Sequence, residues 1–229
     1  MKHVFCQSWH IFGGCMVVSS VMTKNPIIGR SSMSVNEARE IMIREKIGTL
    51  PILDKNEELI GILTKKDLLR ASPSAATTLD MYEISYLLSK MTVEKVMKKE
   101  VITVQDAEVV EEAARIMADN RISCLPVMKG DLLVGIITES DLFRAFVSLF
   151  GARYQGVRVT FLLEEKPGQL AKLTQAIAEK KGNIVSLITY DGDNCTEKYC
   201  TCKVTGISKE AITEILSSIA TKLVDIRIL

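Results

Sequence analysis

Threonine and aspartate recur three residues apart at two places, each time directly after an apolar run. Thr64 and Asp67 follow "GIL", and Thr138 and Asp141 follow "GII". A threonine at the end of a buried strand is a natural N-cap, and an aspartate three residues later lies in the first helical turn, facing back toward it. One interpretation is a capping box alone. The other is an anion site, because the N–H groups and dipole of a helix start hold phosphate while the carboxylate accepts from sugar hydroxyls.

The residues after the two threonines differ in charge. Lys65 and Lys66 place two cations in a first helical turn, where the helix dipole disfavours them by a few tenths of a kcal/mol each. A bound phosphate would reverse that cost. Glu139 and Ser140 suit an empty helix start instead. We therefore expect the Thr64 junction to prefer anions more than the Thr138 junction does.

Each junction closes one copy of an internal repeat. Val21–Ala71 aligns with Val96–Ala145 when one residue is deleted near Gly130, and about twenty of roughly fifty positions are identical. In both copies the pattern predicts strand, helix, strand, strand and helix. Ser34 followed by Glu37 predicts a capping box at the first helix. A unit of about fifty residues is small for standing alone, so we expect the two copies to pack together.

The paired motifs resemble those of cystathionine-β-synthase (CBS) domains in tandem, the Bateman module. The stretches that carry the resemblance are "GTLPIL…GILTKKD" and "SCLPVM…GIITESD", within residues 17–147. The resemblance implies a pseudo-twofold module with two clefts for adenosine-type ligands, such as AMP, ADP, ATP or S-adenosylmethionine. It also implies that the threonine contacts phosphate and the aspartate contacts ribose hydroxyls.

The resemblance assigns residues to each cleft. The family often has Thr-Val in its first strand, which Thr103-Val104 keeps and Ile28-Gly29 does not, so both arguments favour the first cleft. The first cleft is expected to contain Thr64, Lys65, Asp67, Ile102, Thr103, Cys124 and Pro126. The second is expected to contain Thr138, Asp141, Ile27, Ile28 and Pro51.

After Gly151 the pattern changes to strand, helix, strand, strand, helix and strand, which is the ferredoxin-like order. Leu170, Leu173, Ile177 and Ala178 predict the buried face of its first helix. Over residues 156–229 this part resembles an ACT domain, through "PGQL" at Pro167–Leu170 and "GNI" at Gly182–Ile184, although Glu165 stands where the family usually has Asp. The resemblance implies an amino acid bound at a dimer interface. The alternative is a tight turn that caps a helix and binds nothing. The implied amino-acid site consists of Gly168, Gln169, Leu170, Asn183 and Ile184.

The order of these parts is similar to that of the acetoin-utilisation B family. The fold class we predict is α+β, a tandem CBS pair followed by a ferredoxin-like ACT domain. Between the copies, Met81, Ile84, Leu87, Leu88 and Met91 recur at helical spacing and predict a core or dimer-facing helix. The expected divisions are a disordered extension over 1–15, the first repeat over 16–72, a linker with a helix over 73–95, the second repeat over 96–150, and the ACT-like domain over 156–229.

Composition and net charge argue against some classes of partner. A net charge of +1 and 5% aromatic residues argue against nucleic acid, and no apolar run is long enough to span a membrane. Six cysteines without scaffold spacing favour a reducing cytoplasm. Two cysteine groups leave alternatives open. His3, Cys6, His10 and Cys15 could be metal ligands, part of a signal peptide, or part of an unstructured extension, which we favour. Cys195, Cys200 and Cys202 could hold a metal or form a redox pair, but structural cysteines are favoured.

Three functions remain. The first is a non-catalytic sensor that binds an adenine nucleotide, and an amino acid in the ACT domain, and signals as a homodimer to a protein partner. The second is a structural dimer with empty clefts that serves as an assembly module. The third is an enzyme, which the sequence disfavours because residues 16–229 contain no histidine, nucleophile–base pair or Walker loop. We therefore expect no catalytic residue, no metal and no catalytic cofactor.

Overall fold

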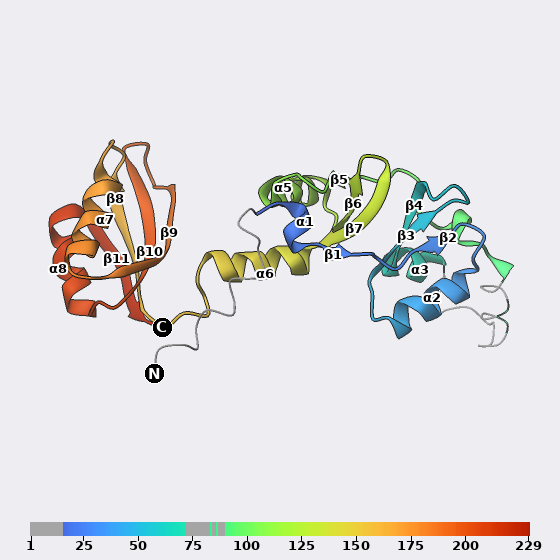
Figure 1. Cartoon of the computed structure of the whole chain (residues 1–229), viewed down its shortest axis with the longest axis horizontal. Helices are drawn as coiled ribbons and strands as arrows, with labels where there is room; N and C mark the ends of the chain where they lie inside the picture. Colours follow the sequence, from blue (N-terminus) through green and yellow to red (C-terminus); the bar gives the residue numbers. More distant parts are fainter. Residues whose placement is uncertain (1–15, 72–82, 84–85, 87–89) are drawn as a thin grey trace. The chain divides into compact units, whose positions relative to one another are not determined.

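The computed structural model describes residues 16–71, 83, 86 and 90–229 (Figure 1). The chain forms two compact units, Met1–Leu142 and Phe143–Leu229, and each is described by itself. The predicted extension over 1–15 lies outside the described residues, and so do Met81, Ile84, Leu87 and Leu88 of the predicted linker helix. Met91 is described, and it packs against the core of the first repeat.

The first repeat forms a three-stranded sheet of mixed direction. Strand β2 pairs parallel with β3, and β3 pairs antiparallel with β4. Helix α2 begins where Ser34 Oγ accepts from the Glu37 N–H at 3.1 Å, which confirms the predicted cap. Its buried residues, Val35, Ala38 and Met42, recur at helical spacing. The elements are β2 (Gly29–Arg30), α2 (Val35–Arg44), β3 (Thr49–Leu53), β4 (Leu59–Thr64) and α3 (Lys65–Ala71).

The second repeat has the same arrangement with one more strand. Its sheet has the order β1-β7-β6-β5, in which β5 is parallel to β6 and the other pairs are antiparallel. Val110, Ala113 and Met117 form the buried face of α5. The elements are β1 (Thr23–Lys24), β5 (Val104–Gln105), α5 (Val110–Asn120), β6 (Cys124–Lys129), β7 (Leu132–Thr138) and α6 (Glu139–Leu149).

The two repeats exchange their first segments. Strand β1 and the short helix α1 (Val18–Val21) precede the first repeat in sequence, yet β1 pairs with β7, and Val18 is fully buried in the core of the second repeat. In return, the 3-10 helix η2 (Val93–Lys95) and Met97 pack in the core of the first repeat. The structural units are therefore offset from the sequence repeat, and neither core is complete without the other copy's leading segment.

The glycine shared by the two copies allows this exchange. A Cβ on Gly61 would collide with the Met97 sulfur, and one on Gly135 would collide with the Met22 sulfur. Directly beside these contacts, the Ile62 N–H donates to the Lys98 carbonyl at 2.9 Å, and the Lys98 N–H donates back at 3.0 Å. The missing side chain thus lets the exchanged segment lie close against the strand.

The C-terminal unit contains a four-stranded antiparallel sheet of order β11-β8-β10-β9, with two helices. This is the predicted ferredoxin-like order, and the predicted α+β class is confirmed. The predicted face of α7 is partly wrong: Leu173 and Ile177 are buried, but Leu170 and Ala178 are exposed. The elements are β8 (Val157–Glu164), α7 (Gln169–Glu179), β9 (Asn183–Asp191), β10 (Glu197–Thr205), α8 (Lys209–Ile219) and β11 (Lys222–Ile228).

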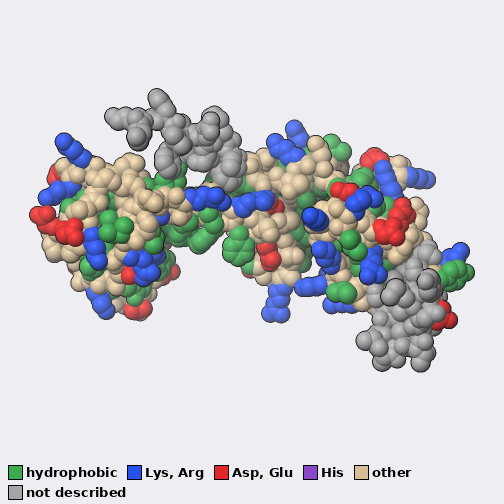
Figure 2. Space-filling model, turned by 90° about the horizontal axis from the view of Figure 1, so that it is seen from below, with side chains coloured by type: hydrophobic (Ala, Val, Ile, Leu, Met, Phe, Trp, Pro, Cys, Tyr) green, Lys and Arg blue, Asp and Glu red, His purple; other side chains and the backbone are tan. Residues whose placement is uncertain are grey.

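The surface shows mixed charge. On the face drawn in Figure 2, basic and acidic side chains are interspersed, and no broad basic surface is visible there. Within the described part of the chain, every helix is too short or too polar to cross a bilayer.

Candidate functional site

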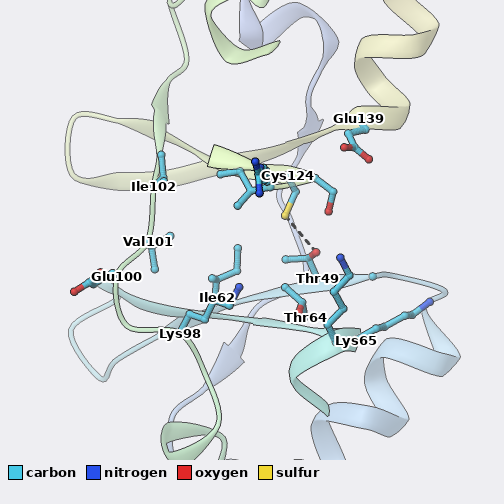
Figure 3. Close-up of a pocket in the computed structure, with 15 residues that line it drawn as sticks. Thr49, Ile62, Thr64, Lys65, Lys98, Glu100, Val101, Ile102, Cys124 and Glu139 are labelled. Carbon is cyan, nitrogen blue, oxygen red and sulfur yellow. Dashed lines mark hydrogen bonds between the residues drawn. The ribbon is translucent and has the colours of Figure 1, made fainter. Parts of the chain in front are cut away.

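A cavity of about 380 Å³ opens beside the end of β4, where Thr64 leads into α3. Its walls come from both repeats. The first repeat supplies Thr49, Thr64 and the start of α3. The segment after η2 supplies Lys98, which pairs with Ile62 of β4, and then Glu100, Val101 and Ile102 (Figure 3). Residues 121–124 and Glu139 of the second repeat supply the rest. The cavity thus lies between the repeats on the side of the Thr64 junction.

The Thr64 junction forms the predicted capping box. Asp67 Oδ2 accepts from the Thr64 N–H at 2.9 Å and from the Thr64 hydroxyl at 2.5 Å. The Asp67 N–H donates to the Thr64 hydroxyl oxygen at 3.3 Å. Asp67 is 6% exposed, and within the described residues its Oδ1 makes no hydrogen bond. The box therefore holds Thr64 and the first turn of α3 in place at the cavity, and one carboxylate oxygen remains unused.

The Thr138 junction repeats the same geometry. Asp141 Oδ2 accepts from the Thr138 N–H at 2.8 Å and from its hydroxyl at 2.7 Å. Neither residue lines the cavity at Thr64. The other residues predicted for the second cleft, Ile27, Ile28 and Pro51, do not line it either. The residues predicted for the second cleft are thus separate from the cavity at Thr64.

The structure brings together part of the set predicted for the first cleft. Thr64, Lys65, Ile102 and Cys124 line the cavity. Three others do not line it. Asp67 is buried and hydrogen-bonded to Thr64, and Pro126 is buried further along β6. Thr103 directly follows the lining residue Ile102.

Charged residues at the cavity extend beyond those the sequence predicted. Lys98, Glu100 and Arg121 line it together with Lys65 and Lys66. Arg121 closes α5 in the left-handed conformation, at a φ of 53°. Local sequence gives no signal for these three residues, because only the exchanged segment and the packing of the two repeats carry them to the Thr64 junction.

Among the described residues, the cations at this cavity have no ionic partner. No salt bridge forms to Lys65, Lys66, Lys98 or Arg121 anywhere in the described part of the chain. Two carboxylates, those of Glu100 and Glu139, also line the cavity, so its walls carry more positive than negative charge. The arrangement suits a ligand that carries an anionic group.

A hydrogen bond joins the two repeats across the cavity. Thr49 Oγ1 and Cys124 Sγ are 3.3 Å apart, and they hold the same position in the two copies, 75 residues apart (Figure 3). Burial raises the pKa of the Cys124 thiol, while the Thr49 hydroxyl opposes that change. Cys124 is thus a neutral contact between the copies, not a reactive thiolate.

The predicted amino-acid site is not assembled within one chain. Gly168 precedes α7 in the left-handed conformation, at a φ of 89°, and no side chain caps the helix. Gly168 follows the C-terminal end of β8 at Glu164. Asn183 begins β9 at the opposite end of the sheet, level with the first residue of β8, Val157. These two ends of the sheet are seven strand residues apart, which is about 23 Å. Gln169 and Leu170 lie with Gly168, and Ile184 with Asn183, so one ligand contacts both segments only if they come from two copies of the chain.

The cysteines of the C-terminal unit belong to its core. Cys200 and Cys202 are fully buried among the apolar side chains of β8, α7 and α8, whereas Cys195 is exposed. Burial raises the pKa of Cys200 to about 11 and that of Cys202 to about 12. Within the described residues no group of three candidate ligands could hold a metal ion.

We expect iodoacetamide at pH 8 to label Cys195 and to leave Cys200 and Cys202 unlabelled, as read by peptide mass spectrometry. Because their pKa values lie above the ordinary value of 9.0, the folded state retains protons that the unfolded state loses. The free energy of unfolding of this unit should therefore fall as pH rises from about 9 toward 12. Equal labelling of all three would contradict the burial.

Comparison with known proteins agrees with this geometry. The model of the CBS domain matches residues 18–74 and 93–148, and the model of the TTHA0829-like ACT domain matches residues 155–227. The chain belongs to the CBS-domain family. The predicted tandem CBS pair with a C-terminal ACT-like domain is confirmed.

Relatives match mainly the CBS pair. A Vibrio cholerae protein ascribed to acetoin utilization (AcuB) is 31% identical, with a TM-score of 0.51, over 61% of this chain and 96% of that one. The CBS pair of protein MJ0100, solved with 5′-methylthioadenosine and S-adenosyl-L-methionine, is 31% identical over 61% of this chain and 99% of that one, with a TM-score of 0.49. An L-aspartate semialdehyde sulfurtransferase of Methanocaldococcus jannaschii is 33% identical over 57% of this chain. The match spans 23% of that enzyme, and about a quarter of each of three homoserine O-acetyltransferases that also match.

Proposed function

We propose that the CBS pair binds an adenine nucleotide or a related adenosyl ligand in the cavity at Thr64, and that the protein is a non-catalytic ligand sensor. The observation that carries the proposal is a set of cations at the cavity that have no ionic partner among residues 16–71, 83, 86 and 90–229: Lys65, Lys66, Lys98 and Arg121. Unpaired cations around a concave, partly apolar space favour an anionic small molecule.

The cavity walls also suit the base and the ribose of an adenine nucleotide. Ile62, Val101 and Ile102 offer an apolar surface for a base, on the side of the cavity away from Lys65 (Figure 3). Ile102 is 40% exposed, so it has apolar surface left to cover. The phosphate would then lie at the other side, near the Thr64 hydroxyl and the start of α3, with the ribose between them.

A ligand there would act on the arrangement of the two repeats. Because both copies line the cavity, and Thr49 and Cys124 join them across it, a change in their separation changes the ligand's contacts. A ligand shifts such an equilibrium only by its difference in affinity for the two arrangements. We propose that a homodimer presents this change to a protein partner.

The lining does not favour catalysis. It contains lysines, glutamates and a thiol whose pKa burial has raised. The Thr64 hydroxyl donates to the Asp67 carboxylate, but the same carboxylate oxygen accepts from the Thr64 N–H, so this pair forms a helix cap. The structural alternative, an assembly module with empty clefts, predicts no ligand at all.

Calorimetric titration separates these functions. We expect saturable heat with at least one of AMP, ATP, 5′-methylthioadenosine and S-adenosylmethionine, and none with inorganic phosphate at the same concentration. Mass spectrometry of the heat-extracted supernatant should identify the same class of ligand in freshly purified protein. No uptake of any adenosyl ligand would remove the sensor and leave the assembly module.

For the C-terminal unit, an amino acid at the Gly168 turn stays a prediction. The uncapped N–H groups at the start of α7 and the open space around Gly168 support it. Since Asn183 lies at the far level of the same sheet, the site would need a second copy, and amino-acid binding should then disappear in a monomeric variant.

A further inference from the structure

We propose that Glu139 restricts the ligand of this cavity to a single phosphate group. The inference rests on the proposed function, and it names a residue that selects among adenine nucleotides. It starts from the different charges that the two copies place at one equivalent position.

Lys65 and Glu139 occupy the same place in the two repeats, directly after Thr64 and Thr138. Both line the same cavity. In Figure 3, Glu139 lies above, on the side of Cys124, and Lys65 lies below, on the side of Thr49. At this equivalent position the first repeat therefore presents a cation to the cavity and the second repeat presents an anion, although Arg121 of the second repeat also lines the cavity. A fully symmetric pair would have offered two lysines.

The apolar wall fixes the direction in which a phosphate chain would run. Ile62, Val101 and Ile102 lie at the side of the cavity away from Lys65 and Glu139 (Figure 3). With the base against these residues, the first phosphate reaches Thr64 and Lys65. Further phosphates would extend into the space between Lys65 and Glu139, where they add negative charge close to the Glu139 carboxylate.

No other residue of the described chain neutralises Glu139. It forms no ion pair there, and it is exposed, so the repulsion is partly screened by water and salt. A modest preference for AMP over ATP follows, not an absolute exclusion. The preference should decrease at high ionic strength.

The test compares the ratio of the ATP and AMP dissociation constants in wild type, Glu139→Gln and Glu139→Lys by calorimetry at low salt. We expect the ratio to fall about threefold in Glu139→Gln and about tenfold in Glu139→Lys. Most of the change should be tighter ATP binding, because the single phosphate of AMP is held at the opposite rim. In 0.5 M salt the differences should largely disappear.

Glu111→Gln and Glu111→Lys are the matched controls. Glu111 lies in the first turn of α5 as Glu139 lies in the first turn of α6, but it does not line the cavity. Both substitutions remove the same favourable interaction with a helix dipole, so any effect on stability is shared.

The outcomes are distinguishable. If wild type and Glu139 variants bind AMP but keep the same ATP to AMP ratio, the selection by Glu139 is wrong while the proposed function stands. An equal change of the ratio in the Glu111 variants would also overturn the selection by Glu139, since a general charge effect would then explain the ratio. If wild type binds no adenosyl ligand, both proposals are lost.

Discussion

A chain carrying both Lys65→Gln and Lys66→Gln should bind AMP about 30-fold more weakly than wild type. Each lysine loses a charge-assisted contact with a dianionic phosphate, and each contact contributes about 1 kcal/mol after screening at these exposed positions. Calorimetry at low salt measures the change. The loss should be larger at low than at high ionic strength.

A pair of lysines outside the cavity controls for net charge. Lys55 and Lys129 lie at the hairpin turns of the two repeats, are exposed, and do not line the cavity. Replacing both by glutamine removes the same total charge, so AMP affinity should change less than about twofold. An equal loss in the two double variants would show that long-range charge, and not contact at Lys65 and Lys66, holds the nucleotide.

Val18→Asp should lower the free energy of unfolding of the CBS pair by about 3 kcal/mol or more. The sequence order assigns Val18 to the first repeat, but its side chain is fully buried in the core of the second. A carboxylate there would be buried without a partner, which costs several kcal/mol. Urea denaturation monitored by circular dichroism measures the change.

The same substitution at Val109 should raise the free energy of unfolding. Val109 is the N-cap residue of α5, is 46% exposed, and offers the helix no side-chain acceptor. Aspartate there can accept from the first-turn N–H groups, so Val109→Asp should stabilise the pair by about 1 kcal/mol. A Val18→Asp variant as stable as wild type would contradict the exchange of leading segments.

Local chemistry predicted much of this fold. Apolar periodicity predicted the order of strands and helices in both repeats and in the C-terminal unit, because that pattern depends on neighbours within a few residues. Ser34 and Thr64 were recognised as caps for the same reason. The error at Leu170 and Ala178 arose where helical spacing alone does not determine which residues at the edge of a face are covered.

Contacts between distant segments could not be predicted. Val18 and Met97 each pack in the core of the other copy, and nothing in either short segment states which sheet it joins. Lys98 and Arg121 reach the cavity only through that packing. The doubled lysine predicts an anion at the Thr64 junction, since that argument depends only on the first turn of one helix. The cavity lies at this junction, and the binding of an anion there stays a prediction.

A crystal structure of the protein grown with millimolar AMP tests the central claim most directly. We predict electron density for the nucleotide in the cavity at Thr64, with its phosphate within 3.5 Å of the Thr64 hydroxyl or the Lys65 ammonium and its base against Ile102. An empty cavity at saturating AMP, or a nucleotide bound only elsewhere on the chain, would contradict it.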